Sequence, residues 1–347
     1  MIKHIWKRII ITAGILIIFM IMIIVLLFYN ELRSLASLKK HDNYPMYSMT
    51  YYGDYGFDDF LSVGAESDTE IENFIIKRLL KGLNIDLSIT RAGCTAFITK
   101  DHDGNILFAR NFDFVYAPSL VVKTHPKNGY ASVSVANLSF AGYTKDWLPN
   151  GIISSFLALS APYIPFDGIN EKGLAIALLA VPEVTLSHDP SKITLNTTTI
   201  IRLILDKADS VDEAVSLIHE YNIYFSGGIN CHYFIADKSG KSVIVEFWDG
   251  DMQVINENVA SNFIAYNKVN IGEGFTEFER YEKVKVALNE NNGILSKRQT
   301  VELLNYIGVY DEGEDKLQWS VTYNLTTPGG LIFANRNIQN IYEFQLK

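Results

Sequence analysis

An uncharged run at residues 9–30 restricts this chain more than any other feature of its sequence. The run is mostly Ile, Leu, Met, Val and Phe, and Lys3, Lys7 and Arg8 precede it. At 1.5 Å per residue, a helix of this length extends about 33 Å, which is enough to cross a bilayer. The sequence therefore predicts a transmembrane signal anchor at residues 9–30, behind a short cytoplasmic tail at residues 1–8.

A cleaved signal peptide is the alternative to an anchor, because Ser34-Leu35-Ala36 is an acceptable small-residue cleavage site. The apolar run is longer than the usual core of a signal peptide, which favours the anchor. Basic residues lie on both sides of the run, so charge bias orients it only weakly. We take the default orientation, a single-pass protein of the cell membrane whose main part is extracytoplasmic.

Charge and composition exclude several classes of protein. The net charge of −9 and the pI near 5.3 give no electrostatic footprint for nucleic acid. Seven His and two Cys are too few for a disulfide framework or a Cys-rich zinc scaffold. We also expect no metal and no organic cofactor. The sequence leaves the number of copies in the assembly open, with a homo-oligomer as one arrangement it allows.

Residues 31–93 are predicted to form a folded pro-segment rather than a flexible stalk. An aromatic and acidic stretch at residues 44–61 is too apolar to remain solvated, so it should pack on another part of the chain. Ser67 and Glu70 have the spacing of a capping box that opens a helix. Ile71, Ile75, Leu79 and Leu83 then give that helix an apolar stripe.

From residue 94 onward the pattern is one of strands with helices gathered between them. Asp101-His102-Asp103-Gly104 separates two apolar runs, which predicts a hairpin of residues 94–99 and 105–110 rather than a calcium loop. Helices are expected at residues 197–208, 210–221 and 276–288 and after Ser296, and further strands at residues 173–181, 231–237, 242–248, 262–266, 319–325, 331–334 and 341–346. This order predicts a layered α+β domain at residues 94–347.

Cys94 opens the first strand of the predicted hairpin, and Arg110 and Asp113 lie at the end of the second. The start of one strand lies beside the end of the other in a two-stranded hairpin, so local geometry alone brings the three residues together. A cation beside a thiol lowers the pKa of that thiol and enriches the nucleophilic thiolate. These residues are therefore candidates for nucleophilic catalysis, although a buried core Cys beside a structural Arg–Asp pair has the same pattern.

Two sequence strings resemble the start of the choloylglycine hydrolase family of linear-amide C–N hydrolases. They are Cys94-Thr95-Ala96-Phe97 and Leu107-Phe108-Ala109-Arg110-Asn111-Phe112-Asp113-Phe114, with Cys-to-Arg and Cys-to-Asp spacings of 16 and 19. Collinear matches follow at residues 167–174, 242–246, 266–267, 279–281 and 319–323. The resemblance implies a four-layer αββα N-terminal-nucleophile hydrolase sandwich and a small-molecule amide substrate.

The family's site residues correspond to particular positions of this chain. The resemblance implies that cleavage after Gly93 exposes Cys94, whose α-amine serves as general base while its thiolate forms an acyl-enzyme. Arg110, Asp113 and Arg280 then support the site, and Asn267 supplies an oxyanion donor. A second donor is expected at Ala180, where bile salt hydrolases carry Asn, so a substrate contact from an Asn side chain is absent here. Asn262 and Asn270 lie near Asn267, which leaves a shifted assignment open.

Three alternatives remain at this point. A disulfide between Cys94 and Cys231 competes with a catalytic role for Cys94, because an extracellular domain with two cysteines often pairs them. Cys231-His232 has the residues of a thiol–imidazole pair, but a position in the sheet core explains it better. At the level of function, an acyltransferase with the same acyl-enzyme and a catalytically silent membrane-tethered binding or sensor protein both remain open.

Overall fold

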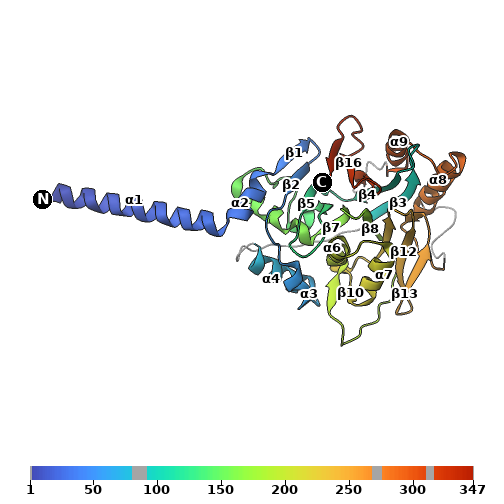
Figure 1. Ribbon diagram of the computed structural model, residues 1–347, viewed down its shortest axis with the longest axis horizontal. Coiled ribbons are helices and arrows are strands. Elements are labelled where there is room, and N and C mark those ends of the chain that lie inside the picture. Colours follow the sequence, from blue (N-terminus) through green and yellow to red (C-terminus); the bar gives the residue numbers. More distant parts are fainter. Residues whose placement is uncertain (1, 80–91, 268–275, 310–315, 347) are drawn as a thin grey trace.

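The computed structural model describes residues 2–79, 92–267, 276–309 and 316–346. Helix α1 (Ile2–Leu27) projects away from the rest of the chain (Figure 1). Its segment Trp6–Leu27 is long and apolar enough to span a membrane, and none of it is buried against the protein. A signal sequence has the same properties, so anchor and signal peptide both remain compatible with this helix. Leu83 and Asn270 lie outside the described residues.

A nine-stranded sheet forms the larger of two stacked sheets, in the order β1-β2-β5-β6-β7-β8-β11-β12-β13. All of its pairs are antiparallel except β2 with β5. Its strands are β1 (Lys39–Asp42), β2 (Met46–Thr50), β5 (Ser119–Thr124), β6 (Ser132–Asn137), β7 (Pro165–Asn170), β8 (Leu174–Ala180), β11 (Cys231–Asp237), β12 (Ser242–Trp248) and β13 (Asp251–Asn256).

A six-stranded antiparallel sheet lies against it, in the order β14-β3-β4-β15-β16-β17. Its strands are β14 (Val259–Ser261), β3 (Ala92–Lys100), β4 (Ile106–Phe114), β15 (Lys316–Asn324), β16 (Gly329–Ala334) and β17 (Tyr342–Gln345). The predicted hairpin is confirmed as β3 and β4. Asp101 closes its turn by accepting the backbone N–H groups of Asp103 and Asn105 at 2.9 Å each.

Helices cover both outer faces of the sheet pair. Helix α6 (Thr197–Lys207) and helix α7 (Val211–His219) pack on strands of the nine-stranded sheet, whereas α8 (Thr276–Glu290) and α9 (Lys297–Ile307) pack on the six-stranded sheet. Side chains of Asn196, Ser210 and Ser296 cap three of them, α6, α7 and α9. This order of layers is the predicted αββα arrangement, and the expected helices lie where the sequence placed them.

Residues 39–79 are an integral part of this fold. They supply β1, β2, α3 (Phe57–Leu61) and α4 (Asp68–Arg78), and their buried aromatic side chains belong to the main hydrophobic core. Tyr55 donates its hydroxyl hydrogen to the buried Asp206 of α6 at 2.6 Å. The prediction that the aromatic stretch packs on the chain is confirmed, and the segment also extends the nine-stranded sheet at one edge.

Smaller elements connect the layers: α2 (Tyr29–Ala36), α5 (Ile152–Ser155), the short 3-10 helices Leu138–Ala141, Phe156–Tyr163 and Ser226–Gly228, and the parallel pair β9 (Thr194–Asn196) with β10 (Asn222–Tyr224). One predicted strand is wrong. Residues 262–266 form a turn after β14, because the backbone N–H groups of Ala265 and Tyr266 bind the Glu246 carboxylate at 2.9 Å instead of a neighbouring strand.

Candidate active site

Cys94 lies at the start of the β3–β4 hairpin with a cation against its sulfur. In the register of the hairpin, Cys94 pairs with Phe112 and Gly93 pairs with Asp113. The Arg110 Nη2 atom donates to Cys94 Sγ at 3.3 Å. Both residues are completely buried. The hairpin thus brings Cys94, Arg110 and Asp113 together as the sequence predicted.

Arg110 bridges the two sheets beneath the thiol. Its guanidinium donates to the carbonyl oxygens of Phe166 and Leu178 at 2.8 Å each, and it forms an ion pair with the buried Asp167 of β7. The same carboxylate accepts the indole N–H of Trp319 at 3.1 Å and the hydroxyl of Tyr323 at 2.5 Å. Asp167 thereby fixes the position of Arg110, a role that was not assigned from the sequence.

The thiol of Cys94 does not have the lowered pKa that its neighbouring cation suggested. Burial raises the pKa of this thiol, and it outweighs the opposing effects of Arg110 and Arg280. Removing the sulfur from water disfavours the thiolate more than the adjacent positive charge favours it. Burial therefore favours the protonated thiol of Cys94, and the adjacent Arg110 cation opposes that effect.

Asp113 and Arg280 form a second ion pair beside Gly93. The Arg280 Nη2 atom donates to Asp113 Oδ2 at 2.5 Å, and the backbone N–H of Val309 donates to Asp113 Oδ1 at 3.2 Å. Arg280 is buried, so it is not a surface partner of Glu277 or Glu279. Its Nε atom is buried and has no hydrogen-bond partner within the described residues. A buried donor of this kind can receive an anionic group of a substrate.

Asn262 connects Cys94 to Ala180 across the two sheets. Its Oδ1 atom accepts the backbone N–H of Cys94, and its Nδ2 atom donates to the carbonyl oxygen of Ala180 at 2.7 Å. Ala180 ends strand β8, so this contact places the predicted Ala180 position next to Cys94. The side-chain amide therefore holds the nitrogen of Cys94, which would become the α-amine if the Gly93–Cys94 bond were cleaved.

Asn267 lies five residues further along the same turn. Its side chain is exposed, and the amide that contacts Cys94 is that of Asn262. The oxyanion role predicted for Asn267 stays a prediction. The geometry favours Asn262 instead, because its side-chain amide contacts Cys94. The sequence signal that could have found Asn262 is its position directly after a buried strand, β14, that pairs with β3.

Glu246 and His232 fix the turn that carries Asn262. The Glu246 carboxylate binds the turn through the N–H groups of Ala265 and Tyr266, and its Oε1 atom lies 2.6 Å from His232 Nδ1. Burial raises the pKa of Glu246, but the His232 contact and the two N–H groups outweigh it, so the pKa lies below its usual value. The carboxylate therefore remains ionised and the turn remains attached to β12.

The second cysteine has a structural position. Cys231 pairs with Ala180 in the nine-stranded sheet, and its thiol donates to the carbonyl oxygen of Ile229 at 3.3 Å. Both cysteines are buried and free, so the alternative of a Cys94–Cys231 disulfide is not realised. Among the described residues, no group of three or more His, Cys, Asp or Glu could share a metal ion. That no metal or cofactor is needed stays a prediction.

Comparison with known proteins decides which family this arrangement belongs to. The sequence profile of the linear amide C–N hydrolases, choloylglycine hydrolase family, matches residues 94–299. The chain belongs to the choloylglycine hydrolase family. A bile salt hydrolase/transferase of Bifidobacterium longum is 29% identical over 174 residues, which are 48% of this chain and 53% of that protein. One from Clostridium perfringens is 28% identical over 177 residues, 48% of this chain and 51% of that protein.

Solved structures of the family share the fold. A mutant conjugated bile acid hydrolase from Clostridium perfringens is 18% identical, with a TM-score of 0.57 over 73% of this chain and 92% of that one. Penicillin V acylase from Agrobacterium tumefaciens is 17% identical, with a TM-score of 0.50 over 70% and 83%. The family profile and the structural likeness confirm the choloylglycine hydrolase family and the α+β fold. The chain spans about half the length of the curated relatives it matches.

Proposed function

We propose that this choloylglycine hydrolase family member hydrolyses linear amide C–N bonds through an acyl-enzyme on Cys94. One observation carries the proposal: the Cys94 sulfur contacts the Arg110 guanidinium at 3.3 Å while the Cys94 nitrogen contacts the Asn262 amide. Cys94 thus has a cation at its sulfur and, at its nitrogen, an amide that can orient the future amine. A small-molecule amide is the expected substrate, and the identity of its acyl group is not assigned.

Activation requires cleavage of the Gly93–Cys94 bond, because in the intact chain the nitrogen of Cys94 is an amide and cannot act as a base. The thiol attacks the unhindered Gly93 carbonyl carbon, the C–N bond breaks, and the Cys94 nitrogen leaves as an amine. Water then hydrolyses the resulting thioester. Asn262 already holds the departing nitrogen, which supports this sequence of steps.

Turnover then uses the freed α-amine, whose ordinary pKa of about 8 suits a general base at neutral pH. The amine takes the thiol proton, the thiolate attacks the substrate carbonyl, and the tetrahedral intermediate expels the substrate amine with that proton. Water attacks the acyl-enzyme and releases a carboxylic acid. Arg110 stabilises the thiolate, and Asp113 with Arg280 lies beside the position vacated by Gly93.

Processing provides the first test. Cleavage after Gly93 divides the 347-residue wild-type chain into fragments of 93 and 254 residues, whereas Cys94→Ala should remain whole because it lacks the attacking sulfur. Intact mass spectrometry and N-terminal sequencing distinguish the two outcomes. A fully active, uncleaved chain of 347 residues would exclude the N-terminal-nucleophile mechanism. A chain that is never cleaved and has no turnover would instead favour the silent binding or sensor protein.

The 254-residue fragment should stay on the membrane after cleavage, provided that α1 is an anchor. Strand β2 pairs with β5 along Met46–Thr50, and most aromatic side chains of residues 44–61 are buried in the common core. Apolar burial and buried backbone hydrogen bonds are not screened by salt. We therefore expect washing at about 1 M salt to release none of the fragment, which immunoblotting of pellet and supernatant would measure.

Cys94→Ala is the control for this wash, because its catalytic part should stay covalently attached. A urea wash should release the 254-residue fragment from wild-type membranes and leave uncleaved Cys94→Ala behind. Quantitative release of the wild-type fragment by salt alone would show that the two parts do not associate.

An acyltransferase is the second candidate, since the matched relatives are named hydrolase/transferase. Both activities share the acyl-enzyme and differ in whether water or an amine attacks it. Adding a primary amine during turnover separates them. A hydrolase should release mainly the carboxylic acid at every amine concentration, whereas a transferase should divert most of the acyl group into a new amide.

A further inference from the structure

A cavity lies at the edge of the sheet pair that is furthest from β13 and β14. It has a volume of about 440 Å³ and opens between β1, β2 and β5 of the large sheet and β17 of the small one. This volume is in the range of pockets that hold small organic molecules. Its lining consists of Ser37, Lys39, His41, Ser48, Met49, Thr50, Val121, Lys123, Val133, Tyr342, Phe344 and Gln345. We call it the edge cavity.

The strand register brings cations and hydroxyl groups to one face of the sheet. Lys39 pairs with Ser48 across β1 and β2, and Thr50 pairs with Lys123 across β2 and β5. The pairing of β1 with β2 is irregular between Lys40 and Asp42, but His41 Nε2 lies 2.7 Å from Ser48 Oγ, which places the His41 ring on the same face as Lys39. The His41 ring lies against the ring of Tyr342 of β17, with 4.1 Å between ring centroids and a tilt of 32°. The cavity is thus basic on the β1–β2–β5 side and aromatic on the β17 side.

The edge cavity contains no acidic residue in its lining, in a chain whose net charge is −9. No carboxylate forms an ion pair with Lys39 or Lys123 within the described residues, and Lys123 Nζ donates to the backbone carbonyl of Gln345 at 3.2 Å. Burial, and then the charge of Lys39, lower the pKa of His41. Uncompensated cations beside an apolar wall favour an anionic ligand.

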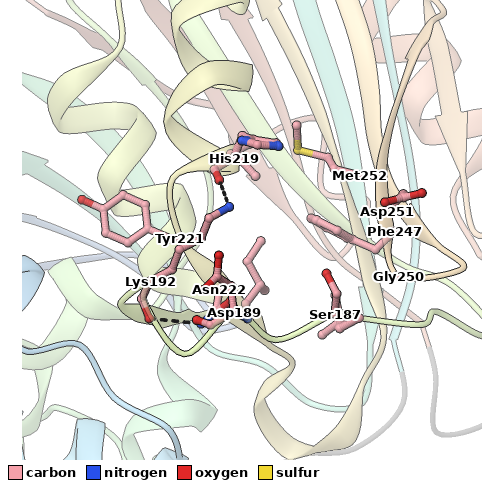
Figure 2. A pocket seen from close by; sticks show the side chains of 13 residues that line it. Ser187, Asp189, Lys192, His219, Tyr221, Asn222, Phe247, Gly250, Asp251 and Met252 are labelled. Carbon is pink, nitrogen blue, oxygen red and sulfur yellow. Dashed lines mark hydrogen bonds between the residues drawn. The ribbon is translucent and has the colours of Figure 1, made fainter.

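The pocket between residues 186–192, the end of α7 and the β12–β13 turn provides a contrast (Figure 2). Its volume is only about 130 Å³, and Asp189 and Asp251 line it together with Lys192. The Lys192 Nζ atom already donates to the carbonyl oxygen of His219 at 2.6 Å, as the dashed line shows. That pocket has carboxylates beside its lysine, whereas the lining of the edge cavity has none.

We propose that the edge cavity is a binding site for an organic anion, a carboxylate or phosphate ester attached to an apolar body. The anionic group lies between Lys39 and Lys123 with the hydroxyl groups of Ser48 and Thr50 within the same face, and the apolar body packs on Tyr342 and Phe344. Lysine ammonium groups donate to either kind of anion. Residues from both sides of the Gly93–Cys94 bond line the cavity, so a bound anion also holds the two parts together.

This site is distinct from the catalytic one. Strands β4, β15 and β16 separate β3, which carries Cys94, from β17, which lines the edge cavity. Amide hydrolysis releases a carboxylic acid, which belongs to the same chemical class as the ligand proposed here. Binding at the edge cavity does not depend on that activity, so the two proposals can fail separately.

Binding is tested on the full chain carrying Cys94→Ala, reconstituted in lipid nanodiscs, so that no catalysis interferes. The probes are naphthylacetate, naphthyl phosphate and the uncharged naphthylethanol. Their binding is measured by saturation-transfer NMR and by equilibrium dialysis, with empty nanodiscs as the control. We expect saturable binding of at least one anion and at least tenfold weaker binding of naphthylethanol. Preference for naphthylacetate assigns a carboxylate ligand, and preference for naphthyl phosphate assigns a phosphate ester.

Matched lysine variants locate the binding. The double variant Lys39→Met with Lys123→Met should weaken anion binding at least tenfold, whereas Lys40→Met should leave it unchanged, because Lys40 points to the opposite face of β1 and is outside the lining. Lys123→Arg keeps the charge and should retain binding, which would assign the loss in the double variant to the missing charge. Equal affinity for the anions and naphthylethanol, equal loss in Lys40→Met, or no saturable binding would overturn the proposal.

Discussion

Asn262→Ala is expected to lower kcat by roughly 10²–10³-fold with little change in KM, a loss typical of removing one oxyanion-hole donor or amine-orienting group. The Asn262 side chain contacts the Cys94 nitrogen and the Ala180 carbonyl, so its removal frees both. The α-amine then loses the contact that orients it as a base. Steady-state kinetics on an amide that the wild type hydrolyses would measure the loss, after mass spectrometry has confirmed processing.

Asn267→Ala is the matched comparison, because it removes the same side chain from the same turn. The structure supports a kcat close to that of the wild type, since Asn267 is exposed and Asn262 contacts Cys94. Asn262→Asp refines the test by keeping an acceptor for the amine while losing the donor to Ala180. A full kcat in Asn262→Ala together with a large loss in Asn267→Ala would restore the assignment made from the sequence.

Local geometry explains why part of the site could be predicted. Arg110 and Asp113 were placed beside Cys94 because a short turn joins the two strands, and the pairing of β3 with β4 follows from that turn. Helix α4 was predicted from Ser67 and Glu70, because a capping residue acts within one turn of helix. Interactions of this kind join residues that are close in the sequence, so the sequence alone predicts them.

Long-range contacts explain what could not be predicted. Strands β5, β6 and β7 were missed, since almost every residue in them is buried and they lack the alternation of a half-exposed strand. Asp167 lies 57 residues from Arg110, and no local pattern indicates that the two side chains meet. Asn262 stayed an alternative to Asn267, because residues 262–266 resembled a strand and the turn they form is held by the distant Glu246.

The raised pKa of the Cys94 thiol was also not predicted, because it depends on long-range packing. The sequence identifies the cation at Arg110, but it does not show that both groups are completely buried. Burial acts on the thiolate in the opposite direction and is larger here. The sign of such a shift is therefore a property of packing between the two sheets rather than of the hairpin alone.

Arg110→Ala should both destabilise the protein and impair the nucleophile. Arg110 and Asp167 are each completely buried, and removing one partner of a buried ion pair typically costs about 3–5 kcal/mol, because the other charge remains without compensation. Arg110 also lowers the thiol pKa, so its loss should raise that pKa further. The thiolate fraction at a given pH then falls, and the acid limb of the kcat/KM profile moves to higher pH.

A second substitution separates these two effects. Asp167→Asn added to Arg110→Ala removes the uncompensated carboxylate, so it should recover part of the lost stability, with a coupling of roughly 0.5–3 kcal/mol. Urea unfolding followed by tryptophan fluorescence measures this recovery. The thiol pKa, titrated by alkylation rate against pH, should stay raised in the double variant, because the cation beside Cys94 is still missing. A thiol pKa that returns to the wild-type value in the double variant would show that Asp167, rather than Arg110, controls the nucleophile.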